Sequence, residues 1–148
     1  MRLKVNTFST VNKPQNEVFQ AIIDQNQLSG YFISRASDSI KEGETITWFF
    51  DDVGVQLEVK ILKVEENRRI EFKWSASGIP AKVEIILTPE TDEKTKIQIT
   101  ETGWKMTESG IQALVQQTQG WTDFICSLKA YLYTGINLRN GTKRAPQS

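Results

Sequence analysis

The stretch VKILKVEENRRIEFKW, residues 59–74, alternates apolar and polar side chains on both sides of Glu66 and Asn67. This alternation has the period of two half-buried strands, and the polar pair between them marks a turn. The apolar parity flips at Leu62 and Val64, which predicts a β-bulge or a strong bend. Because so short a turn joins the two strands, they must be antiparallel neighbours.

Strand patterns continue on both sides of this hairpin and fill most of residues 33–101. Near the start, Leu3, Val5 and Thr7 alternate with polar residues and predict one more strand. We therefore expect one continuous antiparallel sheet of about seven strands. The other strand patterns lie at residues 46–50, 55–61, 83–87 and 97–99.

Helical patterns flank the strands. Two short ones follow the first strand: Pro14 fits the first position of one helix, and residues 26–31 form the other. A much longer pattern begins at Ser109, whose spacing to Gln112 predicts a capping box, and runs to about Leu138. Such a helix would overhang a small flat sheet, so we predict an α+β fold whose curved sheet wraps around it. Its apolar stripe, which Phe124 and Tyr131 widen, comprises Ile111, Leu114, Val115, Thr118, Trp121, Ile125, Leu128 and Leu132.

Length and charge narrow the class of protein. The chain has 148 residues, which predicts a single domain over residues 1–148 with a tail from about residue 139. It carries 18 basic and 18 acidic residues, so its formal net charge is zero. This balance lacks the overall positive charge expected of a nucleic-acid-binding protein, and we expect no nucleic-acid partner. The basic residues Arg139, Lys143 and Arg144 are interpreted as a solvated tail.

The chain contains no histidine, which excludes Ser-His-Asp and Cys-His catalysis and the common zinc sites that use histidine. We find no catalytic constellation and predict no metal and no cofactor; an acid–base enzyme would have to use carboxylates, Lys or Tyr. Cys126 is the only cysteine, so an internal disulfide is excluded. Neither a signal peptide nor a membrane span is recognisable, and we expect a cytoplasmic protein.

Three stretches resemble one known family: residues 59–74, residues 83–104 (VEIILTPETDEKTKIQITETGW) and residues 120–135 (GWTDFICSLKAYLYTG). Together with the order of elements, they resemble the START and birch-pollen-allergen (SRPBCC) superfamily. Within it, they are similar to the C-terminal domain of the heat-shock-protein ATPase activator. The resemblance implies the helix-grip fold and no single activity. The full activator carries a further N-terminal domain, for which 148 residues leave no room, so we expect no co-chaperone activity.

Ten residues are candidates for lining a ligand pocket between the sheet and the long helix. The four tryptophans dominate the set, because indoles stack well on flat or apolar ligands. The alternative is that they fill the core, which we favour for Trp74; for Trp104 and Trp121, each preceded by a glycine, both readings stay open. The candidates are Trp48, Leu57, Trp74, Ile99, Glu101, Trp104, Leu114, Thr118, Trp121 and Ile125.

Three polar positions within or beside this set have two readings each. Glu101 continues the parity of Ile97 and Ile99, so we expect it at the pocket mouth. There it is either a carboxylate of raised pKa facing a ligand, or a partly solvated strand end or the partner of a nearby Lys or Arg. Thr118 offers a hydroxyl to a ligand or, as we favour, bonds back to the preceding helical turn. Cys126 has apolar neighbours and is interpreted as a small core residue.

Three functions are compatible with this sequence. The first is a non-catalytic domain that holds a small apolar or amphipathic molecule, as a monomer or homodimer. The second is an interaction module that modulates a chaperone ATPase or another protein. The third, a weak lyase, cyclase or hydrolase based on carboxylates, is disfavoured by the missing histidine.

Overall fold

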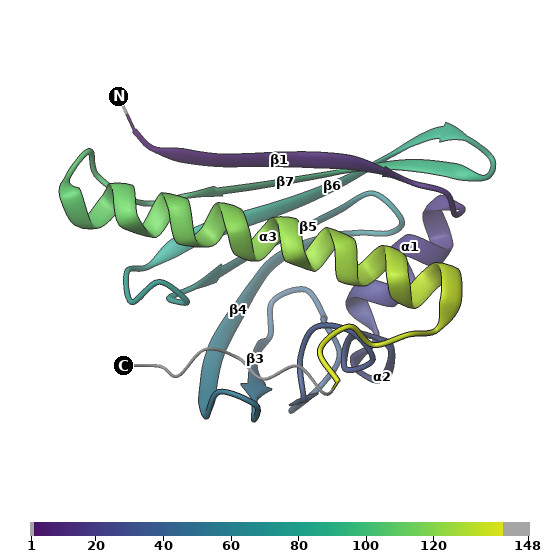
Figure 1. Ribbon diagram of the computed structural model, residues 1–148, viewed down its shortest axis with the longest axis horizontal. Coiled ribbons are helices and arrows are strands. Elements are labelled where there is room, and N and C mark those ends of the chain that lie inside the picture. The colour runs from purple at the N-terminus through teal and green to yellow at the C-terminus, as the bar shows by residue number, and fades with distance from the viewer. Residues whose placement is uncertain (1, 141–148) are drawn as a thin grey trace.

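The computed structural model describes residues 2–140, and its strands form a single curved antiparallel sheet (Figure 1). The order across the sheet is β1-β7-β6-β5-β4-β3-β2. The first strand pairs with the last, and the strands from β2 to β7 form a meander. The elements are β1 (Lys4–Val11), α1 (Gln15–Ile23), α2 (Gln25–Leu28), β2 (Arg35–Ala36), β3 (Thr45–Phe50), β4 (Val55–Glu65), β5 (Arg69–Trp74), β6 (Ala81–Thr91), β7 (Lys94–Thr102) and α3 (Glu108–Thr134). The predicted α+β architecture is confirmed.

A β-bulge bends the sheet where the sequence changes parity. Ile61 pairs with Phe72 and Lys63 pairs with Glu71, so Leu62 is the extra residue on β4. One extra residue turns the following side chains to the other face and increases the local twist. The long helix α3 lies along one side of this curved sheet (Figure 1).

The long helix both begins and ends earlier than predicted. Thr107, not Ser109, is its N-cap, and the Thr107 hydroxyl accepts a hydrogen bond from the backbone N–H of Gly110. At the other end Gly135 adopts φ 75°, which stops the helix in the left-handed conformation that glycine tolerates. Residues 135–140 therefore leave the helix axis. Of the predicted tail, residues 141–148 lie outside the described part of the chain.

The buried face of α3 is rotated relative to the predicted apolar stripe. Trp121, Phe124 and Leu128 pack onto the sheet, whereas Ile111 and Val115 are exposed. A helical period predicts that the helix has an apolar stripe. It does not decide which of two neighbouring stripes of similar hydrophobicity packs against the sheet. The bulky aromatic residues near the middle of the helix decide the outcome, because they bury the largest apolar area.

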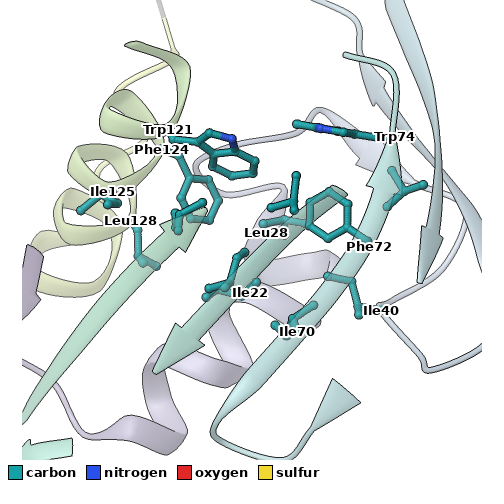
Figure 2. Close-up of a cluster of buried hydrophobic side chains, with 14 of the residues drawn as sticks. Ile22, Leu28, Ile40, Ile70, Phe72, Trp74, Trp121, Phe124, Ile125 and Leu128 are labelled. Carbon is teal, nitrogen blue, oxygen red and sulfur yellow. The ribbon is translucent and has the colours of Figure 1, made fainter. Parts of the chain in front are cut away.

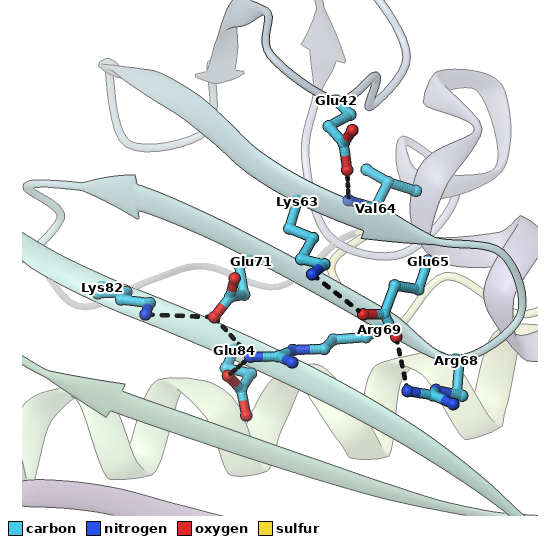
Figure 3. Close-up of polar contacts among 9 residues, drawn as sticks. All are labelled: Glu42, Lys63, Val64, Glu65, Arg68, Arg69, Glu71, Lys82 and Glu84. Atoms are coloured by element: carbon cyan, nitrogen blue, oxygen red, sulfur yellow. Dashed lines mark hydrogen bonds and ion pairs between the residues drawn. The ribbon is translucent and has the colours of Figure 1, made fainter.

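The opposite face of the sheet carries ion pairs instead of a second layer (Figure 3). Arg69 on β5 bridges Glu84 at 2.6 Å and Glu71 at 2.8 Å, and Lys82 lies 3.2 Å from Glu71. Burial raises the pKa of Glu71, but the hydrogen bonds from Lys82 and Arg69 outweigh it and hold this pKa below its usual value.

Candidate functional site

A cavity of about 580 Å³ lies between α3 and the β3–β5 side of the sheet. Its walls come from three parts of the chain: the segment after α2, strands β3 to β5 with their turns, and the cavity-facing side of α3 with the residues that follow it. The lining residues are Tyr31, Phe32, Phe50, Val53, Val55, Leu57, Trp74, Ala76, Gln117, Gly120, Trp121, Asp123, Phe124, Cys126, Ser127, Leu138 and Arg139. Most of these side chains are apolar or aromatic, which is typical of small-molecule sites.

Aromatic rings from the helix and the sheet pack against one another in the cavity wall. Figure 2 shows Trp121 and Phe124 on α3 facing Trp74 and Phe72 on β5. The ring centroids of Trp74 and Trp121 lie 5.4 Å apart at an interplanar angle of 32°, and Phe124 meets Trp121 nearly edge-on at 5.3 Å. Phe32 packs edge-on against Phe124 at 4.8 Å. Such tilted contacts fix the rings in place, so the cavity wall is pre-formed.

Glu101 lies behind this wall and is fully buried instead of standing at the mouth. Its Oε2 accepts a hydrogen bond from Trp74 Nε1 at 2.8 Å, and its Oε1 accepts one from Trp121 Nε1 at 2.8 Å. Gln117 Nε2 donates to both oxygens, at 3.1 and 3.3 Å. Burial raises the pKa of Glu101, and these hydrogen bonds oppose the rise. One carboxylate thereby ties the sheet to α3 through two cavity tryptophans.

The rim of the cavity carries the polar and charged side chains. Asp123 and Cys126 on α3 are both exposed there, so the interpretation of Cys126 as a core residue is wrong. Arg139 belongs to the predicted solvated tail, yet it lines the cavity and forms an ion pair with Asp52 at 2.8 Å. Its guanidinium also lies 5.6 Å from the centroid of the Phe50 ring.

Three of the ten predicted residues line the cavity: Leu57, Trp74 and Trp121. Trp48 and Ile125 are buried beside it, and the Trp48 ring lies 5.9 Å from Trp74. The remaining candidates, Ile99, Glu101, Trp104, Leu114 and Thr118, do not line it.

Trp104 and Thr118 have other roles. Trp104 is buried and its Nε1 donates to the Ser77 hydroxyl at 3.1 Å. The preceding residue, Gly103, lies close to the backbone of Pro80, because a Cβ at residue 103 would lie 2.6 Å from the Pro80 carbonyl oxygen. Thr118 is exposed and donates to the Leu114 carbonyl at 2.7 Å, the back-bond that we favour above.

Sequence reasoning missed the part of the cavity that comes from irregular segments and turns. The short helix predicted over residues 26–31 is α2, which ends at Leu28, so Tyr31 and Phe32 lie in the irregular segment that follows it. Val53 lies in the turn before β4. The aromatic density of residues 31–32 and 48–50 is a sequence signal, but it does not say which rings face a cavity.

Gly120 lies in the middle of α3, lines the cavity and is exposed. A Cβ built there meets no other atom within 4 Å in the described structure. Close packing therefore does not require this glycine, although glycine costs about 1 kcal/mol relative to alanine inside a helix. Because glycine has no side chain, the cavity is open at this position.

Within residues 2–140, no group of three or more Cys, Asp or Glu side chains is placed to hold a metal ion. No helix in that part of the chain is both long and apolar enough to cross a membrane.

Comparisons with known proteins agree with the fold. Protein SSP2350 from Staphylococcus saprophyticus is 28% identical, with a TM-score of 0.80 over 93% of this chain and 96% of that one. DynU16, a protein of the dynemicin biosynthetic locus, is 25% identical, with a TM-score of 0.79 over 90% of this chain and 48% of DynU16. The Aha1 dimer from Colwellia psychrerythraea is 19% identical, with a TM-score of 0.76 over 90% and 98%, and supports the fold alone.

No curated protein matches the chain. The model of one protein family, described as activator of Hsp90 ATPase homolog 1-like protein, matches residues 12–133. This match begins just after β1 and covers α1 to β7 and nearly all of α3, and these elements carry Glu101 and most of the cavity lining. The chain therefore belongs to the family of proteins like homolog 1 of the activator of Hsp90 ATPase.

Proposed function

We propose that this protein binds a small apolar or amphipathic molecule in the cavity between α3 and the sheet, without catalysis. The observation that carries the proposal is the pre-formed aromatic cavity of about 580 Å³. Small-molecule sites typically measure ~300–1,000 Å³ and combine apolar walls with a few polar groups. The likeness to DynU16, from a biosynthetic locus, also supports a small-molecule ligand.

Gly120 supports the same proposal. A residue that weakens its helix and fills no tight space is explained if a side chain there would obstruct the cavity. Gly120→Leu is therefore a blocking variant that should keep or raise the free energy of unfolding, since leucine is a good helix former. Gln119→Leu is the matched control, because Gln119 is the exposed neighbouring residue and does not line the cavity.

The experiment compares the three proteins by native mass spectrometry after purification, followed by extraction and identification of retained molecules. We expect the wild type and Gln119→Leu to retain the same small molecule and Gly120→Leu to lose it. A thermal-shift screen of apolar compounds extends the comparison if the natural ligand is lost on purification. Equal binding by Gly120→Leu and the wild type would contradict the assignment of the cavity as the site.

Modulation of a chaperone ATPase is a second candidate, supported by the family match over residues 12–133. Ile111 and Val115 lie one turn apart on the outer face of α3 and are 46% and 64% exposed, which offers an apolar surface to a partner. The test adds the protein to Hsp90 from the same source. A saturable rise in ATPase rate that Ile111→Ser and Val115→Ser together abolish would place this function first.

We also infer that residues 1–148 form one domain, that the protein works in the cytoplasm, and that it is a monomer or a homodimer. The length of 148 residues supports the first inference, and the single cysteine supports the second. Sedimentation equilibrium distinguishes monomer from dimer.

A further inference from the structure

Two charged side chains line the cavity, and among the described residues only one of them forms an ion pair. Arg139 lines the cavity, but the Asp52 carboxylate lies 2.8 Å from its guanidinium. Asp123 lines the same cavity, and no basic side chain within residues 2–140 lies within ion-pair distance of it. A ligand entering the cavity therefore meets an uncompensated negative charge on α3.

The wall itself also favours positive charge. An aromatic ring is negative on its face, so a cation within about 6 Å of the ring centre is attracted, most strongly by tryptophan. The wall contains six aromatic residues from three parts of the chain, and two of them are neighbouring tryptophans, one on β5 and one on α3. They are Tyr31, Phe32, Phe50, Trp74, Trp121 and Phe124.

Glu101 strengthens this preference from behind the wall. Its two oxygens receive four N–H contacts from Trp74, Trp121 and Gln117, and the same contacts include no acceptor that a carboxylic acid proton would need. The geometry is that of a carboxylate. A negative charge at both indole N–H groups polarises the indoles and makes their faces more negative.

Those hydrogen bonds also remove polar atoms from the cavity interior. The Nε1 atoms of Trp74 and Trp121 point to Glu101, and the Tyr31 hydroxyl donates to the Ala21 carbonyl at 2.9 Å. The two indoles therefore offer only carbon surfaces to a ligand body. The deep wall selects an apolar ring system, and the charge selection occurs where Asp123 lies.

From these observations we propose that the cavity selects ligands with a cationic amine on an aromatic or polycyclic apolar body. The inference rests on the proposed binding function and specifies its ligand class. The body stacks on Trp74 and Trp121, and the amine lies against ring faces and Asp123. Because the protein's formal net charge is zero, its overall field does not create such a preference, and any preference is local.

Three probes with one ring system test the proposal: 1-pyrenemethylammonium, 1-pyrenemethanol and 1-pyrenecarboxylate, titrated at pH 7 by pyrene fluorescence anisotropy. We expect the ammonium probe to bind about fivefold or more tighter than the carboxylate probe, with the alcohol between them. In Asp123→Asn the ammonium affinity should fall about two- to threefold, since an exposed charge pair contributes little, and the alcohol affinity should not change. Glu93→Gln, in the exposed turn between β6 and β7, is the matched control and should leave all three affinities unchanged.

The outcomes separate this inference from the proposed function. Equal affinities for the three probes, blocked by Gly120→Leu, would overturn the charge selection and leave ligand binding in the cavity intact. Tightest binding of the carboxylate probe, lost in Arg139→Gln, would show that the cavity selects anions and would also overturn the inference. Binding of no probe, or binding that Gly120→Leu does not affect, would refute the proposed function and the inference with it.

Discussion

Replacing Glu101 should destabilise the protein, whether or not a ligand is present. Glu101→Ala leaves Trp74 Nε1 and Trp121 Nε1 without their acceptor inside the core. Each unsatisfied buried donor costs about 1–3 kcal/mol, so the two together cost about 4 kcal/mol. Because the folded state no longer has to bury a charge, part of this loss is offset. We expect a net decrease of about 2–3 kcal/mol in the free energy of unfolding.

Urea denaturation followed by far-UV circular dichroism measures this change independently of the tryptophans. With a urea dependence of about 1–3 kcal/mol per molar, the midpoint should fall by about 1–2 M. Glu101→Gln keeps the volume and one acceptor oxygen, so its loss should be smaller. Glu58→Gln on β4 removes an exposed carboxylate and should change stability by less than about 0.5 kcal/mol.

The pH dependence of the free energy of unfolding gives a second, independent test of the contribution of Glu101. Because burial raises the pKa of Glu101 above its ordinary value of 4.5, the folded protein binds this proton more tightly than the unfolded chain. Lowering the pH through the raised pKa towards 4.5 should therefore stabilise the wild type relative to Glu101→Gln, and raising the pH should reverse this gain. An unchanged urea midpoint for both Glu101 variants, together with parallel pH profiles, would refute the role of this carboxylate in tying α3 to the sheet.

Gly120→Ala should raise the free energy of unfolding by about 0.5–1 kcal/mol in urea denaturation, and a decrease would show that a side chain there meets an obstacle. Gly103→Ala should lower it by about 1–3 kcal/mol, because φ is 142° and the new Cβ would lie 2.6 Å from the Pro80 oxygen; an unchanged melting temperature would contradict this. Glu71→Gln should be most destabilising near pH 7, since the lowered pKa of Glu71 contributes stability that is lost as pH falls through that pKa; a pH-independent difference would exclude this contribution. Random duplex DNA should show no binding at physiological salt in a mobility-shift assay, and a salt-dependent shift at low micromolar protein would reveal a basic face.

The sequence by itself determined the local structure and the fold class. Alternation between residues 55 and 74 requires paired strands, and the parity flip at Leu62 locates the bulge, because side chains on a strand must alternate between its faces. The change to a helical period after residue 108 supplies the helix that the sheet wraps. These features depend on neighbours in the chain, so a single sequence contains them.

Only the tertiary structure decided the site. Glu101 continues the buried parity of β7, but its donors come from β5 and α3, and no local pattern specifies partners 16 to 27 residues away. In the same way, the rotation of α3 that exposes Val115 and Cys126 follows from how Trp121 and Phe124 pack on the sheet. A cavity is the space between elements, and its shape depends on distances that the order of residues does not state.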